Sequence, residues 1–344
     1  DDPCLIMYTS GTTGRPKGAV LSHANMYFSA ANVQLSADIR PDDVSLAMAP
    51  LFHIAGLNGV MMPVFLKGGT NVIHRGFNPS VALDELQHGG ITSMFAVPAM
   101  LEALFALPDF ADAQFPALRT LIGGGAPVPD RTLRAWGDKG VGIQQGYGFT
   151  EAAPSVTLLG PEYALSKQGS AGKPQFFMDV RVLHPEGRDA EVGESGELLA
   201  RGMNIMLGYW NRDQDTADSF IDGWYRSGDI AAVDEDGFHF LKDRSKDMYI
   251  SGGENVYPTE VENALLNVPG VAEVAVIGIP DEKWGEVGRA FVVVADAASH
   301  DQASIIAGLE PNLARYKLPK SVVFVDSLPR TATGKVQKHL LRDE

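Results

Sequence analysis

The chain has 344 residues, of which 45% are hydrophobic and 21% are charged, and its formal net charge is −15. This length and composition predict a globular protein of about two domains. The excess of acidic residues argues against a protein that binds nucleic acid over a wide surface.

The content of cysteine and apolar residues narrows the class further. Cys4 is the only cysteine, which excludes an internal disulfide and a cysteine zinc site and leads us to expect a cytoplasmic protein. No apolar run approaches the length of a membrane span, and the first residues do not resemble a signal peptide. We therefore expect no transmembrane segment.

The first predicted element is a strand that runs into the loop of residues 8–18, with the sequence YTSGTTGRPKG. Its glycines allow the backbone to approach a ligand, and its successive N–H groups can form an anion-binding nest. Lys17 adds a charge suited to phosphate. A second strand over residues 19–21 and a helix capped by Ser22 are predicted to follow. The alternative is a polar surface turn.

Short apolar strands then alternate with helices. We predict strands over residues 44–49, 70–74, 92–97 and 118–122. A helix is predicted over residues 78–88, with Asn78 as its cap, Pro79 in its first position and Gly89 at its end. This alternation predicts an α/β fold with a mostly parallel sheet covered by helices. Because the chain starts almost at a strand that we expect to be buried, we expect an N-terminally truncated sheet.

The pattern changes after residue 168. Strands over residues 179–184, 196–202 and 229–233, and a hairpin turn at 234–237, predict a β-rich subdomain. A charged break at 243–247 precedes helices at 258–266 and 303–314 and strands at 271–279, 290–295 and 321–325. We thus predict an α/β region over 1–168, a β-rich subdomain over 169–242, a linker over 243–247 and a small mobile C-terminal α/β domain over 248–344.

Polar residues at predicted strand ends are candidate ligand contacts. The segment 144–151 lies at the carboxyl end of a strand, where ligands bind in open α/β sheets. Tyr147 can stack on a purine, Thr150 can donate to a phosphate, and Glu151 is a hard oxygen ligand for Mg²⁺. The glycine-rich segment 123–127 can line a flat ligand with its backbone, although an ordinary tight turn explains it equally well.

Three further positions carry weaker signals. Asp229, which we place at the start of a strand, can accept hydrogen bonds from both ribose hydroxyls, but Gly-Asp pairs are also common in turns. His53 lies in an apolar stretch, where a histidine is more often structural than catalytic. Lys335 lies in a glycine-containing loop near the C-terminus, and a surface lysine is the usual alternative.

Five of these strings resemble, in order and spacing, the motifs of the acyl-adenylate-forming superfamily, which includes acyl-CoA synthetases, coumarate ligases, luciferases and peptide-synthetase adenylation domains. The strings are YTSGTTGRPKG, YGFTE, YRSGD, DRSKD and PRTATGK. The stretch DRSKDMYISGGENVYPTEVE most resembles bacterial fatty-acyl-CoA synthetases. The resemblance implies an AMP-forming ligase that uses ATP, Mg²⁺ and coenzyme A to make acyl-AMP and then acyl-CoA.

The resemblance also assigns roles to individual residues. The catalytic residues are Lys335, Thr150 and Glu151, and Glu151 also binds the metal. The nucleotide and coenzyme A contacts are Thr9, Ser10, Gly11, Thr12, Thr13, Gly14, Lys17, Gly125, Ala126, Gln145, Gly146, Tyr147, Asp229, Arg244, Lys246, Gly252 and Gly253. The acid-binding residues are His53, Gly56, Gly124 and Ala152. Lys246 matches the hinge about which the small domain rotates between the two half-reactions.

Several alternatives stay open. The presumed acyl pocket is apolar and lined by small residues, which favours a medium- or long-chain fatty acid, but an aromatic acid such as a hydroxycinnamate also fits. A peptide-synthetase domain needs an acidic residue for the substrate amine, and the stretch PLFHIAGLNG has none. The motifs do not exclude a luciferase-type oxygenase, and a truncated chain is also compatible with an inactive nucleotide-binding remnant.

The expected partners are accordingly small molecules: a carboxylic acid, ATP and coenzyme A. We expect no nucleic acid partner. A transient contact with a membrane surface is compatible with a long acyl chain. The sequence does not indicate an oligomeric state.

Overall fold

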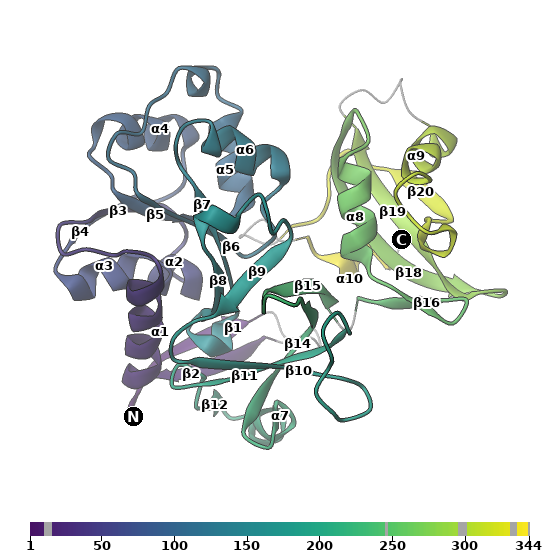
Figure 1. Cartoon of the computed structure of the whole chain (residues 1–344), viewed down its shortest axis with the longest axis horizontal. Coiled ribbons are helices and arrows are strands. Elements are labelled where there is room, and N and C mark those ends of the chain that lie inside the picture. Colours follow the sequence, from purple (N-terminus) through teal and green to yellow (C-terminus); the bar gives the residue numbers. More distant parts are fainter. Residues whose placement is uncertain (10–15, 245–246, 295–300, 331–335, 343–344) are drawn as a thin grey trace. The chain divides into compact units, whose positions relative to one another are not determined.

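The computed structural model describes residues 1–9, 16–244, 247–294, 301–330 and 336–342. Contacts between Cα atoms divide the chain into two units (Figure 1). The first comprises Asp1–Ser227 and Ala232–Leu241, and the second comprises Gly228–Ala231 and Lys242–Glu344. The division at residue 168 and the hinge at 243–247 stay predictions.

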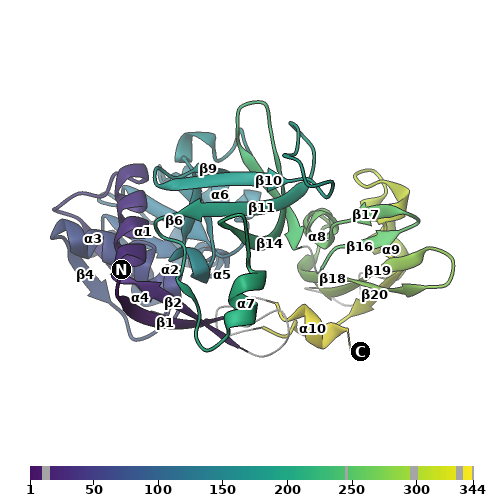
Figure 2. The same ribbon diagram turned by 90° about the horizontal axis from the view of Figure 1, so that it is seen from below.

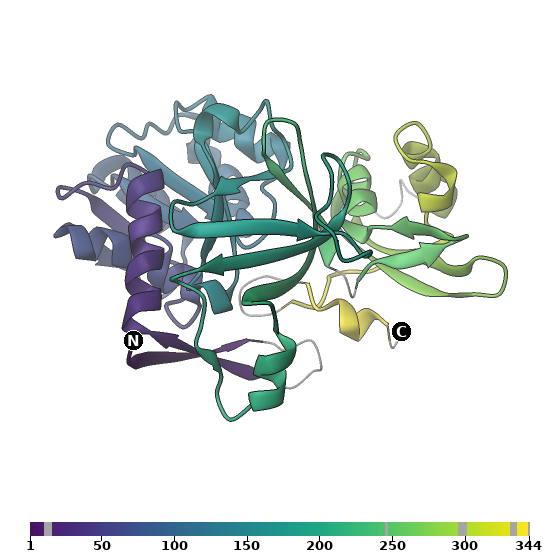
Figure 3. The ribbon, with the colours of Figure 1, turned by 60° about the horizontal axis from the view of Figure 1, so that its bottom comes forward.

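The chain begins with an antiparallel hairpin of β1 (Pro3–Thr9) and β2 (Lys17–Ser22), in which Thr9 pairs with Lys17 (Figure 3). The short strand β12 (Gly208–Tyr209) pairs with the other edge of β2 and completes a three-stranded sheet. The expected buried first strand is wrong: β1 is mostly exposed, because it is an edge strand of this small sheet.

Helix α1 (His23–Ser36) follows β2 directly, as predicted. The Ser22 hydroxyl accepts the backbone N–H of Asn25 at 3.1 Å, and the Asn25 side chain accepts the N–H of Ser22 at 2.9 Å. This reciprocal capping satisfies donors that a helix N-terminus otherwise leaves unpaired. The two predicted strands and the capped helix are confirmed in this order, whereas residues 10–15 between the strands lie outside the described residues.

A second sheet contains twelve strands in the described part of the chain, and its parallel part has the order β4-β3-β5-β6-β7. Its strands are β3 (Val44–Ala47), β4 (Thr70–Ile73), β5 (Ser93–Ala96), β6 (Thr120–Gly124) and β7 (Ile143–Gly148). The helices between them are α2 (Ile54–Asn58), α3 (Met61–Lys67), α4 (Pro79–His88), α5 (Pro98–Phe105) and α6 (Asp130–Gly137). Asn78 caps α4, as predicted.

The parallel strands are covered on both faces, because their side chains alternate in direction. Met94 and Leu121 belong to the core cluster that also contains residues of α4, α5 and α6. Their neighbours Phe95 and Ile122 belong to the cluster that contains residues of α1 and α3. The predicted α/β fold with a parallel sheet covered by helices is confirmed.

The predicted β-rich segment continues the same sheet (Figure 2). After β7 the order is β8 (Ser155–Leu159), β9 (Ser170–Pro174), β15 (His239–Arg244), β14 (Trp224–Val233), β11 (Gly196–Gly202) and β10 (Met178–Leu183). The short strand β13 (Phe220–Ile221) pairs with β14, and helix α7 (Asp213–Asp218) lies between β12 and β13 in sequence. Strand β14 begins at Trp224, so the placement of Asp229 at a strand start is wrong.

The second unit contains a five-stranded sheet packed against helices. Its elements are β16 (Tyr249–Ser251), β17 (Glu254–Val256), α8 (Pro258–Leu266), β18 (Val271–Asp281), β19 (Gly285–Val294), α9 (Gln302–Leu309), β20 (Ser321–Phe324) and α10 (Lys338–Leu341). Helix α8 matches its prediction, whereas α9 ends earlier than predicted. Within the described residues, no helix is both long and apolar enough to cross a membrane.

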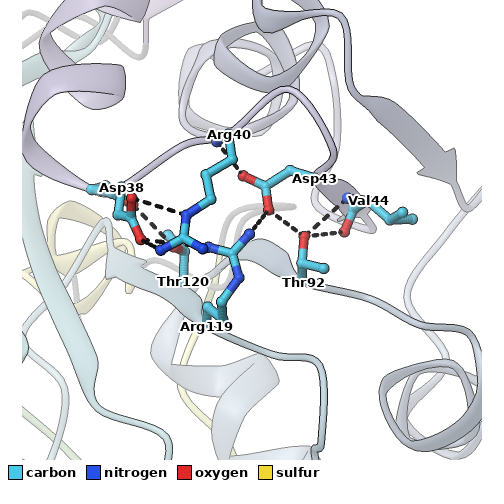
Figure 4. A network of polar contacts seen from close by, with 8 residues as sticks. Asp38, Arg40, Asp43, Val44, Thr92, Arg119 and Thr120 are labelled. Carbon is cyan, nitrogen blue, oxygen red and sulfur yellow. Dashed lines mark hydrogen bonds and ion pairs between the residues drawn. The ribbon is translucent and has the colours of Figure 1, made fainter.

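A buried carboxylate ties together the amino ends of three parallel strands (Figure 4). The Asp43 side chain, 1% exposed, accepts hydrogen bonds from the Thr92 hydroxyl and from the Arg119 guanidinium, both at 2.5 Å. It also accepts the backbone N–H of Arg40 at 2.7 Å. Thr92 directly precedes β5 and Arg119 directly precedes β6, so one anion sets the relative positions of these strands and β3.

We expect Asp43→Ala to lower the free energy of unfolding by about 3 kcal/mol, because it removes the shortest contact of the Arg119 guanidinium and of the Thr92 hydroxyl. Among the described residues, these two donors then keep only Asp38 at 3.5 Å and the Val44 carbonyl at 3.3 Å. Urea denaturation measures this change. Asp42→Ala removes the same charge from the exposed neighbouring position and should change stability by less than about 0.5 kcal/mol. Equal losses in the two variants would contradict a specific role for the buried carboxylate.

Candidate functional site

The carboxyl ends of β6 and β7 form one edge of the candidate site. The parallel register pairs Gly124 with Gly146, so the predicted residues 124–126 and 145–147 are neighbours. A Cβ atom on Gly124 would lie 3.1 Å from the Gly146 carbonyl oxygen, and Gly125 has a φ of +85°. The close approach at Gly124 and the positive φ at Gly125 both favour glycine here, which leaves a flat edge of backbone. Ala126 is exposed beside it.

Glu151 lies in the short 3-10 helix η2 (Thr150–Ala152) and is 8% exposed. Its Oε1 accepts a hydrogen bond from the Tyr209 hydroxyl at 2.6 Å, and that hydroxyl lies 3.2 Å from the Tyr225 hydroxyl. Burial and the nearby Glu151 charge raise the pKa of both Tyr209 and Tyr225. Both phenols therefore keep their protons at neutral pH, and Tyr209 serves Glu151 as a neutral donor.

A buried polar stripe on α1 holds the surroundings of this turn. Asn25, Ser29 and Asn32 share one face of the helix, at spacings of four and three residues. The Asn25 amide donates to the carbonyls of Met203 and Ile205, both at 2.8 Å. Ser29 accepts the N–H of residue 155 at 3.3 Å, and Asn32 accepts the N–H of residue 177 at 2.8 Å.

Two further buried amides bind the turn itself. The Asn204 side chain, fully buried, donates to the carbonyls of Ala152 at 2.6 Å and Ser155 at 2.8 Å. The Asn58 side chain donates to the carbonyl of Ala153 at 2.6 Å. The amides thus hold the turn through the carbonyls of Ala152 and Ala153 and through that of Ser155, the first residue of β8.

Lys17 reaches the same cluster from the hairpin. Its ammonium pairs with the Asp215 carboxylate of α7 and lies 5.2 Å from the centre of the Tyr209 ring. Tyr209 therefore joins Lys17, on its ring, to Glu151, on its hydroxyl. Thr9 lies opposite Lys17 and donates its hydroxyl to the Lys17 carbonyl at 3.5 Å. The predicted loop contacts Ser10, Gly11, Thr12, Thr13 and Gly14 lie outside the described residues.

The acid-binding predictions fall on α2 and η2. His53 precedes α2, and its Nε2 atom is buried without a hydrogen-bond partner among the described residues. Burial lowers the pKa of His53, so its ring is neutral at pH 7. A Cβ atom on Gly56 would lie 2.3 Å from the Pro50 carbonyl oxygen, which excludes a side chain there. Ile54 packs in the cluster that also contains Ala153, so α2 lies beside the turn.

A second unpaired polar atom lies at the end of β7. Gln145 accepts the N–H of Val128 at 3.2 Å through its Oε1, whereas its buried Nε2 has no partner in the part of the chain that the structure describes. Unpaired buried polar atoms are rare in native structures and mark places where a ligand or water completes the hydrogen bonding. Gln145 and His53 thus each carry a buried polar atom that has no hydrogen-bond partner among the described residues.

The second unit holds the remaining predicted residues. Asp229 is buried within β14, and Arg244 ends β15. Gly252 and Gly253 form the turn between β16 and β17, with φ values of +63° and +89°. Lys246 and Lys335 lie outside the described residues. Arg330 and Val336, on either side of the segment 331–335, pair as an isolated β-bridge.

A buried ion pair anchors the helix that follows this segment. Lys338 of α10 pairs with Glu262 of α8 at 2.7 Å. Burial alone would lower the pKa of Lys338, but Glu262, Asp243 and Asp247 together raise it. Arg342, the residue after α10, pairs at 2.9 Å with Asp247, the last residue of the predicted hinge segment.

The donor set can be tested against Mg²⁺. Among the described residues, no three His, Cys, Asp or Glu side chains are grouped so as to hold a metal ion. Glu151 is a buried carboxylate held by one phenol. Since Mg²⁺ in nucleotide sites usually takes one or two carboxylates together with substrate phosphates, this single carboxylate fits an ion that arrives with a phosphate ligand.

Reasoning from the sequence missed three residues of this cluster: Tyr209, Asp215 and Tyr225. Tyr225 is the first residue of the recognised string YRSGD, and its place in that motif was the available signal. Tyr209 and Asp215 carry no local signal, since they reach Lys17 and Glu151 only through long-range pairing. Asn204, which holds the turn, was missed for the same reason.

Two family models match the chain. The family model described as AMP-binding enzyme matches residues 1–210, and the model of its C-terminal domain matches residues 260–335. A feruloyl-CoA synthase from an Amycolatopsis species is 49% identical over 342 residues, which cover 99% of this chain and 70% of that protein. The long-chain fatty-acid–CoA ligase FadD13 from Mycobacterium tuberculosis is 42% identical over 344 residues, 100% of this chain and 68% of that protein.

A solved structure shows the same fold. The o-succinylbenzoate coenzyme A synthetase of Bacillus subtilis, in complex with ATP and magnesium ion, aligns with a TM-score of 0.89 and 37% sequence identity. The alignment covers 98% of this chain and 69% of that one.

We expect Asn204→Ala to lower the free energy of unfolding by about 2 kcal/mol, because it leaves two buried carbonyls without donors. Chemical denaturation measures the loss. Asn263→Ala, at an exposed position of α8 outside the cluster, is the control for losing an amide, and it should cost less than the Asn204 change. An unchanged midpoint for Asn204→Ala would mean that the turn keeps its conformation without this amide.

Proposed function

The chain belongs to the AMP-binding enzymes of the acyl-adenylate-forming superfamily, and on that premise we propose that it is an ATP-dependent carboxylic acid–CoA ligase. In the first half-reaction, the acid carboxylate attacks the α-phosphorus of ATP, and pyrophosphate leaves as acyl-AMP forms. In the second, the coenzyme A thiolate attacks the acyl carbon and AMP leaves. ATP, Mg²⁺ and coenzyme A are the expected cosubstrates of this class.

The observation that carries the proposal is the meeting of Lys17 and Glu151 at Tyr209. The two residues are 134 positions apart in the sequence. An ammonium suited to phosphate and a carboxylate suited to Mg²⁺ are what a metal-bound triphosphate requires on its two sides. Lys17 would bind phosphate oxygens, and Glu151 would bind the ion that those oxygens share.

The other predicted residues supply contacts along the nucleotide and the acid. The backbone at Gly125 and Ala126 and the ring of Tyr147 would enclose the adenine, and Asp229 and Arg244 would bind the ribose. Thr150 would donate to the α-phosphate. Lys335 would neutralise the charge that builds between the carboxylate and the phosphorus in the transition state.

The second half-reaction requires a different set of contacts. Gly252 and Gly253 would line the path of the pantetheine arm. Their positive φ values form a tight turn without side chains at its tip. Lys246 would act as the pivot that exchanges this turn for Lys335.

The acid itself has two candidates. The apolar, small-residued lining favours a medium- or long-chain fatty acid, as in the 42% identical relative named for long-chain fatty acids. The 49% identical relative named for feruloyl-CoA supports a hydroxycinnamate as the second candidate. In either case, His53 and Gly56 of the α2 region, with Gly124 and Ala152, would contact the acid near its carboxylate.

Pyrophosphate release and thioester formation, measured over a panel of fatty and hydroxycinnamic acids, test the proposal. We expect acid-dependent pyrophosphate release, followed by acyl-CoA formation when coenzyme A is added. A preference of at least tenfold in kcat/KM for one class identifies the acid. ATP binding without pyrophosphate release for any acid would instead indicate a nucleotide-binding protein without ligase activity.

We expect Glu151→Gln to raise the Mg²⁺ concentration needed for half-maximal pyrophosphate release by about tenfold or more, because an amide is a weaker ligand for a hard cation. The amide oxygen can still accept the Tyr209 hydroxyl, so the turn should keep its geometry. Excess Mg²⁺ should restore part of the rate. An unchanged magnesium titration would place the ion at another residue.

A further inference from the structure

Lys17 is not free to meet a phosphate, because an internal carboxylate already holds it. The Lys17 ammonium pairs with Asp215 Oδ1 and lies over the Tyr209 ring, and the lysine side chain is 15% exposed. The Lys17 ammonium in turn lowers the pKa of Asp215, so the partner is an anion at neutral pH. A phosphate chain that binds Lys17 must therefore compete with a resident negative charge.

The backbone around Asp215 is fixed in place. Asp215 lies in α7, and the neighbouring Thr216 hydroxyl accepts the N–H of Tyr209 in β12 at 2.8 Å. A Cβ atom on Gly208 would lie 2.8 Å from the Thr216 methyl carbon, so α7 and β12 are closely packed. The Asp215 carbonyl also accepts the Ser219 hydroxyl at 2.6 Å. Since β12 pairs with β2, these contacts fix Asp215 next to the strand that begins at Lys17.

A second cation lies on the other oxygen of the same carboxylate. Nη1 of Arg212, the residue before α7, lies 4.0 Å from Asp215 Oδ2. The arginine is 44% exposed and can move closer without disturbing the core. Asp215 thus has one cation on each oxygen, and the loss of Lys17 does not leave it without a partner.

From this geometry, and on the basis of the proposed function, we propose that Asp215 is a positioning residue that holds Lys17 in the nucleotide-free protein and releases it to the triphosphate. Arg212 neutralises Asp215 once Lys17 has moved. The exchange sets the affinity for ATP and also for pyrophosphate, because both present the phosphates that Lys17 would bind. Asp215 itself does not contact the reacting atoms.

The proposal predicts opposite effects for the two neighbours of Lys17. Asp215→Asn removes the competitor and should tighten binding of MgATP and of pyrophosphate about two- to fivefold, the range expected for a partly exposed ion pair. Arg212→Gln strengthens the hold of Asp215 on Lys17 and should weaken both by about twofold. Equilibrium titration with each compound measures these constants, and single-turnover adenylation should show a changed ATP concentration dependence with a similar maximal rate.

Two controls separate this exchange from general electrostatics. Asp213→Asn removes one exposed negative charge from the same helix and should leave both constants unchanged. In a Lys17→Met background, where binding is weaker, Asp215→Asn should have no further effect. In an Asp215→Asn background, Arg212→Gln should likewise leave the binding constants for MgATP and pyrophosphate unchanged.

The outcomes that overturn the proposal are distinct. Weaker binding by Asp215→Asn would mean that the carboxylate orients Lys17 productively. If Asp213→Asn tightens binding as much as Asp215→Asn does, the carboxylate acts only by long-range repulsion of the ligand. The same conclusion would follow if Asp215→Asn still tightened binding in the Lys17→Met background. If the unchanged protein binds pyrophosphate but forms no acyl-AMP, the proposed ligase function fails, while the pyrophosphate titrations still decide the role of Asp215. Binding of neither compound overturns both.

Discussion

Buried side-chain amides hold the turn that carries Glu151, and the geometry of the whole candidate site depends on them. The side chains of Asn25 and Asn204 connect α1, the segment 203–206 and the turn after η2 through hydrogen bonds to backbone carbonyl groups. Fully paired polar groups in a core specify one arrangement, since every alternative leaves a buried donor or acceptor unpaired. The buried polar side chains of α1 therefore select one conformation of this region, whereas apolar residues at the same positions would stabilise it without selecting a conformation.

Because these amides hold the segment 203–206 in place, a strand of only two residues is enough to bring distant parts of the chain together. The segment that Asn25 holds leads directly into β12, a strand of two residues. That strand pairs with β2 and brings Tyr209 between Lys17 and Glu151. Helix α7 follows and places Asp215 on the far side of Lys17. The hairpin, the end of β7 and the β12–α7 segment thus form one cluster in the first unit.

How much of this could be predicted depended on the range of the interactions. The caps at Ser22 and Asn78 and the alternation of strands and helices are local patterns, and they gave correct elements. The motif strings drew attention to Lys17 and Glu151 but could not show their common neighbour, because the pairing of β12 with β2 leaves no periodic signal. The same limit explains two errors. The exposure of β1 depends on the sheet to which it belongs, and the start of β14 depends on its pairing with β13.

The ring and the hydroxyl of Tyr209 contact two different charged groups, and this determines how substitutions at those groups combine in kinetic measurements. Its ring contacts the cation that would bind phosphate, while its hydroxyl contacts the carboxylate that would bind the metal. Residues that share a partner show non-additive free energies, so substitutions at Lys17 and Glu151 are thermodynamically coupled even though the two side chains do not touch in the described contacts. The effect of substituting Lys17 on a rate constant therefore depends on whether Glu151 is intact, and the effect of substituting Glu151 depends on Lys17.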